Sequence, residues 1–508
     1  MLLSLPTMLR SPANQPPRLL RKFTPLVQRA ALGSLLAVAG AGLACSSTDG
    51  SSGANGGQGT AGAAPIAGSG AGGAAAGSAG APASGGAGAS GVAGAAAGSV
   101  GSGTAGAAPS GGAGGSVGTA GTGGGGAGGG GGGATKWVGT WTGSPYTIPS
   151  DGMPPSPLSN AVVRQVAHVS LGGASIRVQF SNLVGNGPVT IKSAHVALCK
   201  SAVTADSTID TATDKALAFS GMEAVTIAQG QEVWSDAIAL NVPALANVTI
   251  TTAFGAVPST ITGHSGSRTT SYVKAASTDV SAADMASAQP TDHWYYISGI
   301  DVMADASAKA VVAIGDSITD GRGTDTNKNN RWTDVLASRL QKNAATANVA
   351  VMNQGIGATN LVGTGTAAQA RFARDVLGQS GVKYAIVYDG VNDIGNGSAF
   401  APMKAVYDAM ISAAHAKNVL VYGATIPPFG GNAYYSVAHE DVRKQVNTYI
   451  KSGVFDGVID FDTALTDGAS PPKLQATFAA WSQMDGLHPG PAGYQKMGET
   501  PDLMLFTK

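Results

Sequence analysis

From Lys309 onward, short runs of apolar residues alternate with longer segments in which polar and apolar residues are mixed. An apolar run of about five residues is typical of a strand that is buried on both faces. The predicted strands are Ala310–Ile314, Val349–Asn353, Tyr384–Tyr388, Val419–Ala424 and Val458–Phe461. The predicted helices are Arg331–Gln341, Ala367–Val376, Pro402–Ala416, Ser436–Lys451 and Pro491–Glu499. This alternation predicts a parallel sheet with helices on both faces, in which ligands bind beyond the carboxyl ends of the strands.

The preceding part of the chain, from Trp137 to about Met303, has a different pattern. Short runs of β-branched residues alternate with polar residues, as in Val162–Ala167 and Ser175–Phe180, and turn-forming sequences such as Gly185–Pro188 separate the runs. A period of two is typical of strands that bury one face. We therefore expect an all-β sandwich in this part.

The first residues of the chain combine positive charge with an apolar run. Five basic side chains lie before the apolar segment Ala30–Ala44, which is too short to cross a bilayer. This pattern predicts a signal peptide over residues 1–45 and hence an exported protein. The segment Gly42–Cys45 resembles a bacterial lipobox, so we expect membrane attachment through a lipidated Cys45. Cleavage by ordinary signal peptidase, followed by simple secretion, is the alternative.

Residues 46–135 are rich in glycine, alanine and serine. About half of the 75 glycines of the chain fall here, and Asp49 is the one charged residue of the stretch. Such a segment has too little apolar surface to offset the entropy that ordering costs. We expect a disordered linker with a root-mean-square reach on the order of 50 Å. The predicted order is then a signal peptide (1–45), this linker, a β-sandwich domain (136–305) and an α/β domain (306–508).

Charge and cysteine content narrow the function classes. The formal net charge is zero, with 30 basic and 30 acidic residues, and no basic stripe occurs, so we expect no nucleic-acid partner. The two cysteines, Cys45 and Cys199, lie in very different surroundings, and we expect no disulfide between them. Cys199 follows a strand-like run and is predicted to be a small buried apolar residue.

A serine follows the first strand of the predicted parallel sheet. The run Val311–Ile314 leads into Gly315, and Ser317 lies two residues later, before Gly321. A rigid strand can fix a hydroxyl while the turn keeps it reachable, which suits a nucleophile. A serine after an aspartate in a loop can equally be a helix cap or a turn residue, and the local pattern leaves both interpretations open.

Four segments in this part of the chain resemble the conserved blocks of the SGNH/GDSL hydrolase family, and they follow in the family's order. They are Gly315–Gly321 (block I), Asn353–Asn360 (block II), Gly390–Gly395 (block III) and Asp485–Pro489 (block V). The similarity extends to Asn330–Trp332 and Trp137–Trp141, and it is closest to the acetylxylan-esterase-like branch that carries an N-terminal β-sandwich. The resemblance implies a three-layer α/β/α, flavodoxin-like hydrolase domain with a parallel sheet after the sandwich.

The resemblance also implies a role for individual residues. Ser317 corresponds to the nucleophile, His488 to the general base and Asp485 to the carboxylate that orients His488. This chemistry is consistent, because serine needs an imidazole to take its proton and the carboxylate stabilises the imidazolium. The implied oxyanion hole consists of the backbone N–H of Ser317, an N–H of block II and the side-chain amide of Asn392.

Block II departs from the family at one position. Where the family has glycine, this chain has Ala358, and Gly357 lies one residue earlier. Alanine still offers an N–H, so either Gly357 or Ala358 is a candidate for this donor of the oxyanion hole.

The other titratable residues near the motifs are interpreted as structural. We assign the remaining histidines to packing or surface roles: His168, His195, His264, His293, His415 and His439. Four aspartates, Asp316, Asp320, Asp389 and Asp393, lack both metal-loop spacing and histidine companions, so turn roles are favoured over a metal site. No metal and no cofactor is expected.

Together these features predict an exported serine esterase that hydrolyses carboxylic esters through an acyl-enzyme. The expected partner is an acetylated polysaccharide, such as plant xylan, or a small ester. A lipase or lysophospholipase is the alternative within enzymes. A carbohydrate-binding surface protein with a vestigial hydrolase is the alternative outside them, because the fold alone does not choose among functions.

Overall fold

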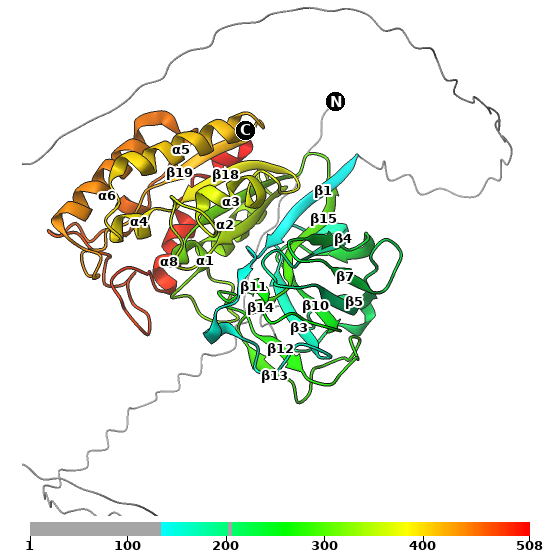
Figure 1. Cartoon of the computed structure of the whole chain (residues 1–508). Coiled ribbons are helices and arrows are strands. Elements are labelled where there is room, and N and C mark those ends of the chain that lie inside the picture. Colours follow the sequence, from blue (N-terminus) through cyan, green and yellow to red (C-terminus); the bar gives the residue numbers. More distant parts are fainter. Residues whose placement is uncertain (1–133, 202–205) are drawn as a thin grey trace, which may run out of the picture. The chain divides into compact units, whose positions relative to one another are not determined.

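The computed structural model describes residues 134–201 and 206–508 (Figure 1). The predicted signal peptide (1–45), Cys45 and all but the last two residues of the predicted linker (46–135) lie outside these ranges. Export, lipidation and the tether therefore remain predictions. Within the described ranges, we find no helix with the length and apolar content needed to cross a bilayer.

The N-terminal part of the described chain consists of antiparallel strands in three sheets. One sheet contains β1 (Thr135–Thr142), β15 (Ile297–Asp305), β4 (Gly173–Ser181), β8 (Glu232–Trp234) and β9 (Ile238–Val242). The second contains β13 (Gln289–Thr291), β12 (Ser271–Lys274), β3 (Val162–His168), β10 (Asn247–Phe254), β5 (Val189–Leu198), β6 (Lys215–Ala216) and β7 (Val225–Ile227). The third, small sheet contains β14 (Trp294–Tyr295), β11 (Thr262–His264) and β2 (Tyr146–Thr147).

The two larger antiparallel sheets share one hydrophobic core. Alternate residues of β4, Ile176 and Val178, and of β10, Val248 and Ile250, belong to this cluster. This alternation is the period-two pattern that the sequence shows, so the prediction of an all-β part is confirmed. Cys199, directly after β5, carries a free thiol and is half-buried rather than fully buried as we expected. Burial raises the pKa of this thiol to about 12.

The C-terminal part contains a five-stranded parallel sheet in the order β17-β16-β18-β19-β20. The strands are β16 (Lys309–Gly315), β17 (Val349–Gly355), β18 (Val382–Tyr388), β19 (Leu420–Ala424) and β20 (Gly457–Ile459). The order changes direction at β16, because the chain first adds β17 on one side of it and then β18 on the other. Ligands of doubly wound sheets bind at such a switch point, beyond the carboxyl ends of the strands.

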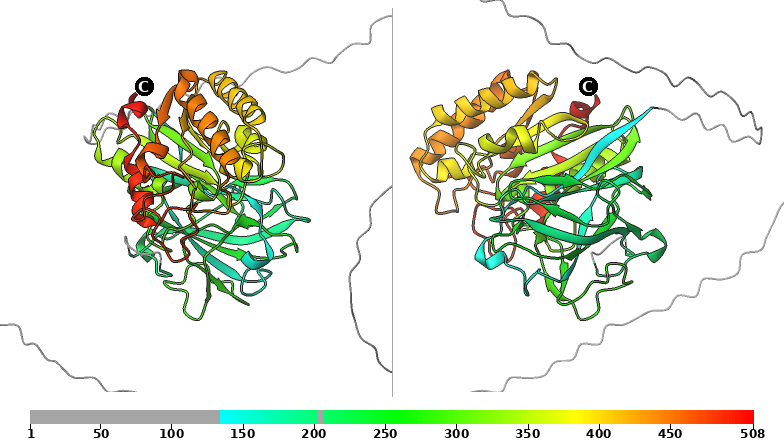
Figure 2. Two further views of the ribbon diagram at one scale, coloured as in Figure 1. Left: turned by 90° about the vertical axis from the view of Figure 1, so that its left-hand side faces the viewer. Right: turned by 45° about the vertical axis from the view of Figure 1, so that its right-hand side comes forward.

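Helices cover both faces of the parallel sheet (Figure 2). The five predicted helices are present as α2 (Trp332–Lys342), α3 (Ala368–Asp375), α5 (Phe400–His415), α6 (Val437–Tyr449) and α8 (Pro491–Glu499). Three short helices that we did not predict are α1 (Ser317–Asp320), α4 (Val391–Gly395) and α7 (Phe461–Leu465). Helix α8 contacts α2 and α7, and helix α5 contacts α3 and α6. The predicted three-layer α/β/α architecture is confirmed.

The β-rich part covers the open edge of the parallel sheet at β17. Ser170 Oγ accepts the backbone N–H of Val351 at 2.9 Å, and Thr142 Oγ1 donates to the carbonyl of Asn353 at 2.9 Å. Gly139 in β1 packs so closely on β17 that an added Cβ would lie 2.4 Å from Met352 Sδ. An edge strand carries unpaired backbone groups, and here side chains of the β-rich part satisfy some of them.

Candidate active site

Ser317 lies at the carboxyl end of β16, as the first residue of α1. Asp316 caps this helix, because its side chain accepts the N–H of Ile318 at 2.8 Å. Gly321 ends the helix with φ of 99°, a left-handed conformation that glycine adopts without steric cost. Gly315 is required on the other side, since a Cβ there would lie 2.3 Å from the carbonyl oxygen of Tyr388. The glycines that flank the serine therefore serve the tight turn.

The structure brings Ser317, His488 and Asp485 into one hydrogen-bonded chain. Ser317 Oγ lies 2.7 Å from His488 Nε2, and His488 Nδ1 lies 2.6 Å from Asp485 Oδ2. Ser317 and His488 are buried, whereas Asp485 is half-buried. Because the carboxylate accepts the proton on Nδ1, it leaves Nε2 free to accept the serine proton. This is the geometry of an activated nucleophile.

A tight loop delivers Asp485 and His488 together. Asp485 Oδ1 accepts the N–H groups of Leu487 at 3.0 Å and of His488 at 2.9 Å. Gly486 has φ of 74°, and a Cβ there would lie 2.4 Å from the backbone of Gly431. Burial raises the pKa of Asp485, but the hydrogen bonds from His488 and Leu487 lower it by more. The net pKa is therefore below the ordinary value. Asp485 therefore stays ionised as a partner of the imidazole.

The pKa of His488 is lowered from its ordinary value of 6.5. Burial is the largest cause, because it disfavours the charged ring. Asp485 acts in the opposite direction, and the positive charges of Arg322 and Arg268 lower the pKa further. The imidazole is therefore neutral at neutral pH, as a general base must be.

Asn392, in α4, is held in one orientation beside the block II segment. Its Nδ2 donates to the carbonyl of Thr359 at 2.7 Å, and its Oδ1 accepts the hydroxyl of Tyr434 at 3.2 Å. One of its two amide hydrogens has no acceptor among the described residues. This hydrogen is the one that an oxyanion can use.

The structure leaves both block II donors as candidates. Neither Gly357 nor Ala358 donates its N–H to another described residue. Ala358 is exposed and has φ of 60°, a left-handed conformation that costs an L-residue about 1–2 kcal/mol. The left-handed backbone at this position explains why the family has glycine there, and this chain adopts the same conformation with alanine.

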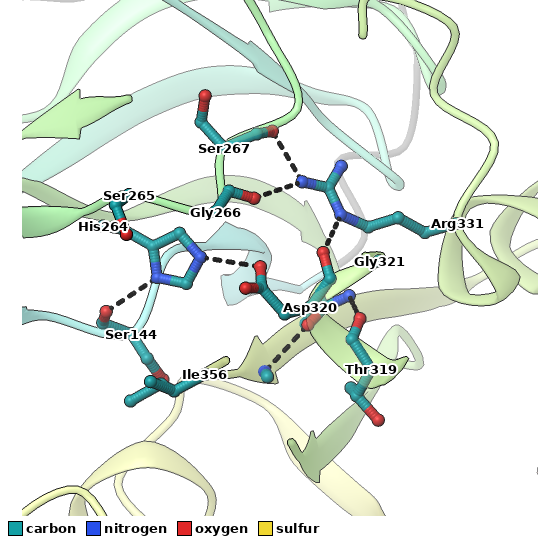
Figure 3. A network of polar contacts seen from close by, with 12 residues as sticks. Ser144, His264, Ser265, Gly266, Ser267, Thr319, Asp320, Gly321, Arg331 and Ile356 are labelled. Atoms are coloured by element: carbon teal, nitrogen blue, oxygen red, sulfur yellow. Dashed lines mark hydrogen bonds and ion pairs between the residues drawn. The ribbon is translucent and has the colours of Figure 1, made fainter. Parts of the chain in front are cut away.

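Sequence reasoning missed an ion pair between His264 and Asp320 (Figure 3). His264 Nε2 lies 3.0 Å from Asp320 Oδ1, and His264 Nδ1 lies 3.0 Å from the carbonyl oxygen of Ser144. Both ring nitrogens face acceptors, so both bonds form only when each carries a proton. Each side chain is 4% exposed. Burial raises the pKa of Asp320, but the interaction with His264 and its hydrogen bond outweigh this effect. The net pKa is below the ordinary value, so the carboxylate is ionised.

Arg331 secures the same helix. Arg331 Nε donates to the carbonyl oxygen of Asp320 at 2.7 Å, and Arg331 Nη2 donates to the carbonyls of Gly266 and Ser267 at 3.0 and 2.5 Å (Figure 3). Arg331 therefore bridges α1 and the β-rich part. No sequence signal indicates this arrangement, because 56 residues separate His264 from Asp320.

The remaining residues that we assigned to structural roles have structural contacts. Asp389 Oδ1 accepts the N–H of Gly390 at 2.8 Å, and Asp393 accepts the N–H groups of Leu361 and Val362. The other histidines bond to nearby polar groups: His168, His195, His293, His415 and His439. Within residues 134–201 and 206–508, no cluster of three or more His, Cys, Asp or Glu side chains could hold a metal ion.

Comparisons with known proteins give one family match. Residues 313–496 match the model of the GDSL-like Lipase/Acylhydrolase family. A search of curated proteins gives no match.

Solved structures resemble part of the chain at low identity. A protein assigned to the G-D-S-L lipolytic family from Desulfitobacterium hafniense is 24% identical over 38% of this chain and 97% of its own, with a TM-score of 0.31. A GDSL-like lipase from Bacteroides thetaiotaomicron is 17% identical over 39% and 87%, with a TM-score of 0.30. An acetyl-xylooligosaccharide esterase variant from Geobacillus Stearmophilus is 18% identical over 40% and 95%, with a TM-score of 0.32.

Loss of the buried ion pair is expected to destabilise the protein. We predict that Asp320→Asn lowers the free energy of unfolding by about 2–3 kcal/mol, because it removes the buried carboxylate that pairs with His264. Asp214→Asn is the matched control, since Asp214 pairs with His195 at 2.8 Å where both side chains are more exposed. We expect it to cost less than about 1 kcal/mol. Urea unfolding measures both, and equal losses would contradict the assignment.

Ala358→Gly is expected to stabilise the protein by about 1 kcal/mol, because glycine adopts a left-handed conformation without strain. Ala409→Gly, at an exposed position inside α5, makes the same chemical change at helical φ and should destabilise by about 0.5–1 kcal/mol. Thermal unfolding should show these opposite signs. A loss of stability in Ala358→Gly would show that the conformation carries no strain.

The lowered pKa of His488 predicts the acidic limb of the pH profile. The kcat/KM for p-nitrophenyl acetate should fall with the protonation of His488, with a midpoint below 6.5. Arg322→Gln removes a neighbouring cation, so its midpoint should lie at higher pH. Lys444→Gln, which removes the same charge from the exposed face of α6, should leave the midpoint in place. A wild-type midpoint at or above 6.5 would refute the assignment.

Proposed function

We propose that this protein is a serine esterase that works through an acyl-enzyme, starting from the fact that its C-terminal part is a GDSL-like lipase/acylhydrolase domain preceded by a β-rich region. One observation carries the proposal. Ser317 Oγ, His488 and Asp485 form a hydrogen-bonded chain at the carboxyl end of β16.

In the first half of the reaction, Ser317 Oγ attacks the carbonyl carbon of the ester while its proton passes to His488 Nε2. The negative charge that develops on the carbonyl oxygen is stabilised by the N–H of Ser317, by the N–H of Gly357 or Ala358 and by the amide of Asn392. When the intermediate collapses, the C–O bond to the alcohol breaks. The alcohol leaves with the proton from His488, and the acyl group stays on Ser317.

In the second half, a water molecule replaces the alcohol. It gives a proton to His488 and attacks the acyl-enzyme, and the carboxylic acid leaves as Ser317 regains its proton. Asp485 keeps its charge throughout and stabilises the imidazolium in both halves, for which its lowered pKa is suited.

We further propose that the ester is an acetyl ester on a plant polysaccharide such as xylan. The sequence similarity to the acetylxylan-esterase-like branch supports this substrate. Export through residues 1–45, a lipid on Cys45 and a long linker would place the enzyme outside the cell, where such polymers occur. A long-chain lipase is the alternative that the following experiment separates.

The proposal predicts how the wild type and three variants act on p-nitrophenyl acetate and octanoate. Wild type should prefer the acetate, and an organophosphonate should label Ser317. Ser317→Ala should lose both activity and labelling, because no acyl-enzyme can form. Asn392→Ala should lower kcat by about 10²–10³-fold with little change in KM, because this donor acts after negative charge has developed.

Ser482→Ala is the matched control, since Ser482 is exposed in the loop that precedes Asp485. It should retain activity and labelling. Faster turnover of the octanoate would favour the lipase alternative. Substantial esterase activity in Ser317→Ala would refute the catalytic assignment.

A further inference from the structure

Arg322 lies beside the catalytic histidine in the C-terminal part. It follows Gly321, and its backbone N–H donates to the carbonyl of Ser317 at 2.9 Å. Its guanidinium lies 6.0 Å from the ring centroid of Trp481, and that ring meets the ring of His488 edge-on at 6.2 Å. The side chain is exposed and donates to Gln483 in the same exposed loop. The positive charge of Arg322 therefore lies next to the site, and no carboxylate of the described residues pairs with it.

Arg268 approaches the same histidine from the β-rich part. It is the last residue of the segment Gly266–Ser267–Arg268, which follows β11. Arg331 binds the carbonyls of Gly266 and Ser267 (Figure 3). Its own carbonyl accepts the N–H of Asn327 at 2.9 Å. The backbone of Arg268 is thus fixed in position, although its φ of 52° is unfavourable for a non-glycine residue. Strained backbone of this kind is common at binding sites.

One nitrogen of the Arg268 guanidinium, Nε, has no hydrogen-bond partner among the described residues. This nitrogen is buried, and among the described residues Arg268 forms no ion pair. The other buried or half-buried arginines near it and elsewhere have carboxylate or carbonyl partners: Arg164, Arg177, Arg331, Arg371 and Arg443. The carboxylates closest to the site are already engaged, Asp320 by His264 and Asp485 by His488. A buried N–H without an acceptor is costly, so the Nε of Arg268 points to a ligand that accepts from it.

The reaction itself indicates which part of a substrate meets these arginines. The leaving alcohol must take its proton from His488 Nε2, so the alcohol part of the ester lies on the side of His488. Asn392 and block II bind the carbonyl oxygen instead. Both Arg268 and Arg322 carry their charge close enough to His488 to lower its pKa, after burial as the main cause. Arg322, which lies against the Trp481 ring that meets His488, is therefore on the side of the alcohol part, and the charge of Arg268 acts on the same ring.

We propose that Arg268 and Arg322 bind an oxyanion on the alcohol part of the substrate, so that the preferred substrates are acetyl esters of acidic saccharides. A guanidinium fork matches a carboxylate or a phosphate. This inference rests on the proposed esterase function and names its substrate class. A uronic acid supplies the carboxylate in a polysaccharide, and a sugar phosphate supplies the alternative oxyanion.

A matched pair of polymers tests this substrate class. Acetylated polygalacturonate carries free carboxylates, and its methyl-esterified form has the same backbone without the charge. We expect wild type to release acetate from the charged polymer with at least about tenfold higher kcat/KM, and this preference should weaken with salt. Arg268→Gln and Arg322→Gln should each reduce the preference by about tenfold or more. Lys444→Gln, with the same loss of charge on α6, should keep it.

Competition identifies the oxyanion. Galacturonate and glycerol phosphate are each added to wild type during hydrolysis of p-nitrophenyl acetate, and inhibition by either one supports the site. Inhibition by neither, or equal wild-type rates on the two polymers, would overturn the inference. An equal loss on both polymers in Arg268→Gln and Arg322→Gln would also overturn it, because the arginines would then act on His488 alone.

Failure of the proposed function is visible separately. If wild type neither hydrolyses p-nitrophenyl acetate nor reacts with an organophosphonate, the esterase proposal fails. Calorimetry with Ser317→Ala still measures binding of the two polymers without turnover. Tighter binding of the charged polymer supports the anion site in that case, and equal binding overturns it.

Discussion

A single turn of α-helix is not stable by itself in water, and this constraint falls on the residue that the rest of the site needs most. Ser317 begins a four-residue helix, α1. The helix is held from outside by the cap of Asp316, by the bond from Arg331 to the carbonyl of Asp320, and by the buried contact of Asp320 with His264. Because His264 belongs to the β-rich part, the position of the nucleophile depends on a part of the chain that holds none of the triad.

The same dependence explains why the two parts pack so closely. β17 is an edge strand, and Ser170 and Thr142 bind its backbone at Val351 and at Asn353, where the block II segment begins. Block II then supplies the N–H candidates of Gly357 and Ala358. The β-rich part therefore steadies both sides of the site, the turn with the nucleophile and the segment with the oxyanion donors. A rigid support of this kind keeps donors at the distances that transition-state stabilisation requires.

The sequence predicts local features of this protein well and distant pairings poorly. The five strands of the parallel sheet follow from apolar runs, and the five long helices follow from the mixed segments between them. Asp485 and His488 share one loop, so their spacing is visible. The contact of His264 with Asp320 joins segments 56 residues apart, and no periodicity reports it. The conformation of Ala358 is hidden for another reason. Alanine gives no sign of left-handed backbone, which only the family's glycine indicated.

The charges around His488 oppose one another, and a substrate can shift their balance. A general base must become an imidazolium during the reaction, yet Arg322 and Arg268 disfavour that positive charge, and Asp485 alone compensates. An oxyanion bound to the two arginines would neutralise them and raise the pKa of His488 while the substrate is present. The base would then be stronger in the complex than in the free enzyme. In this way, an acidic substrate would improve its own hydrolysis, and a neutral ester would meet a weaker base at the same site.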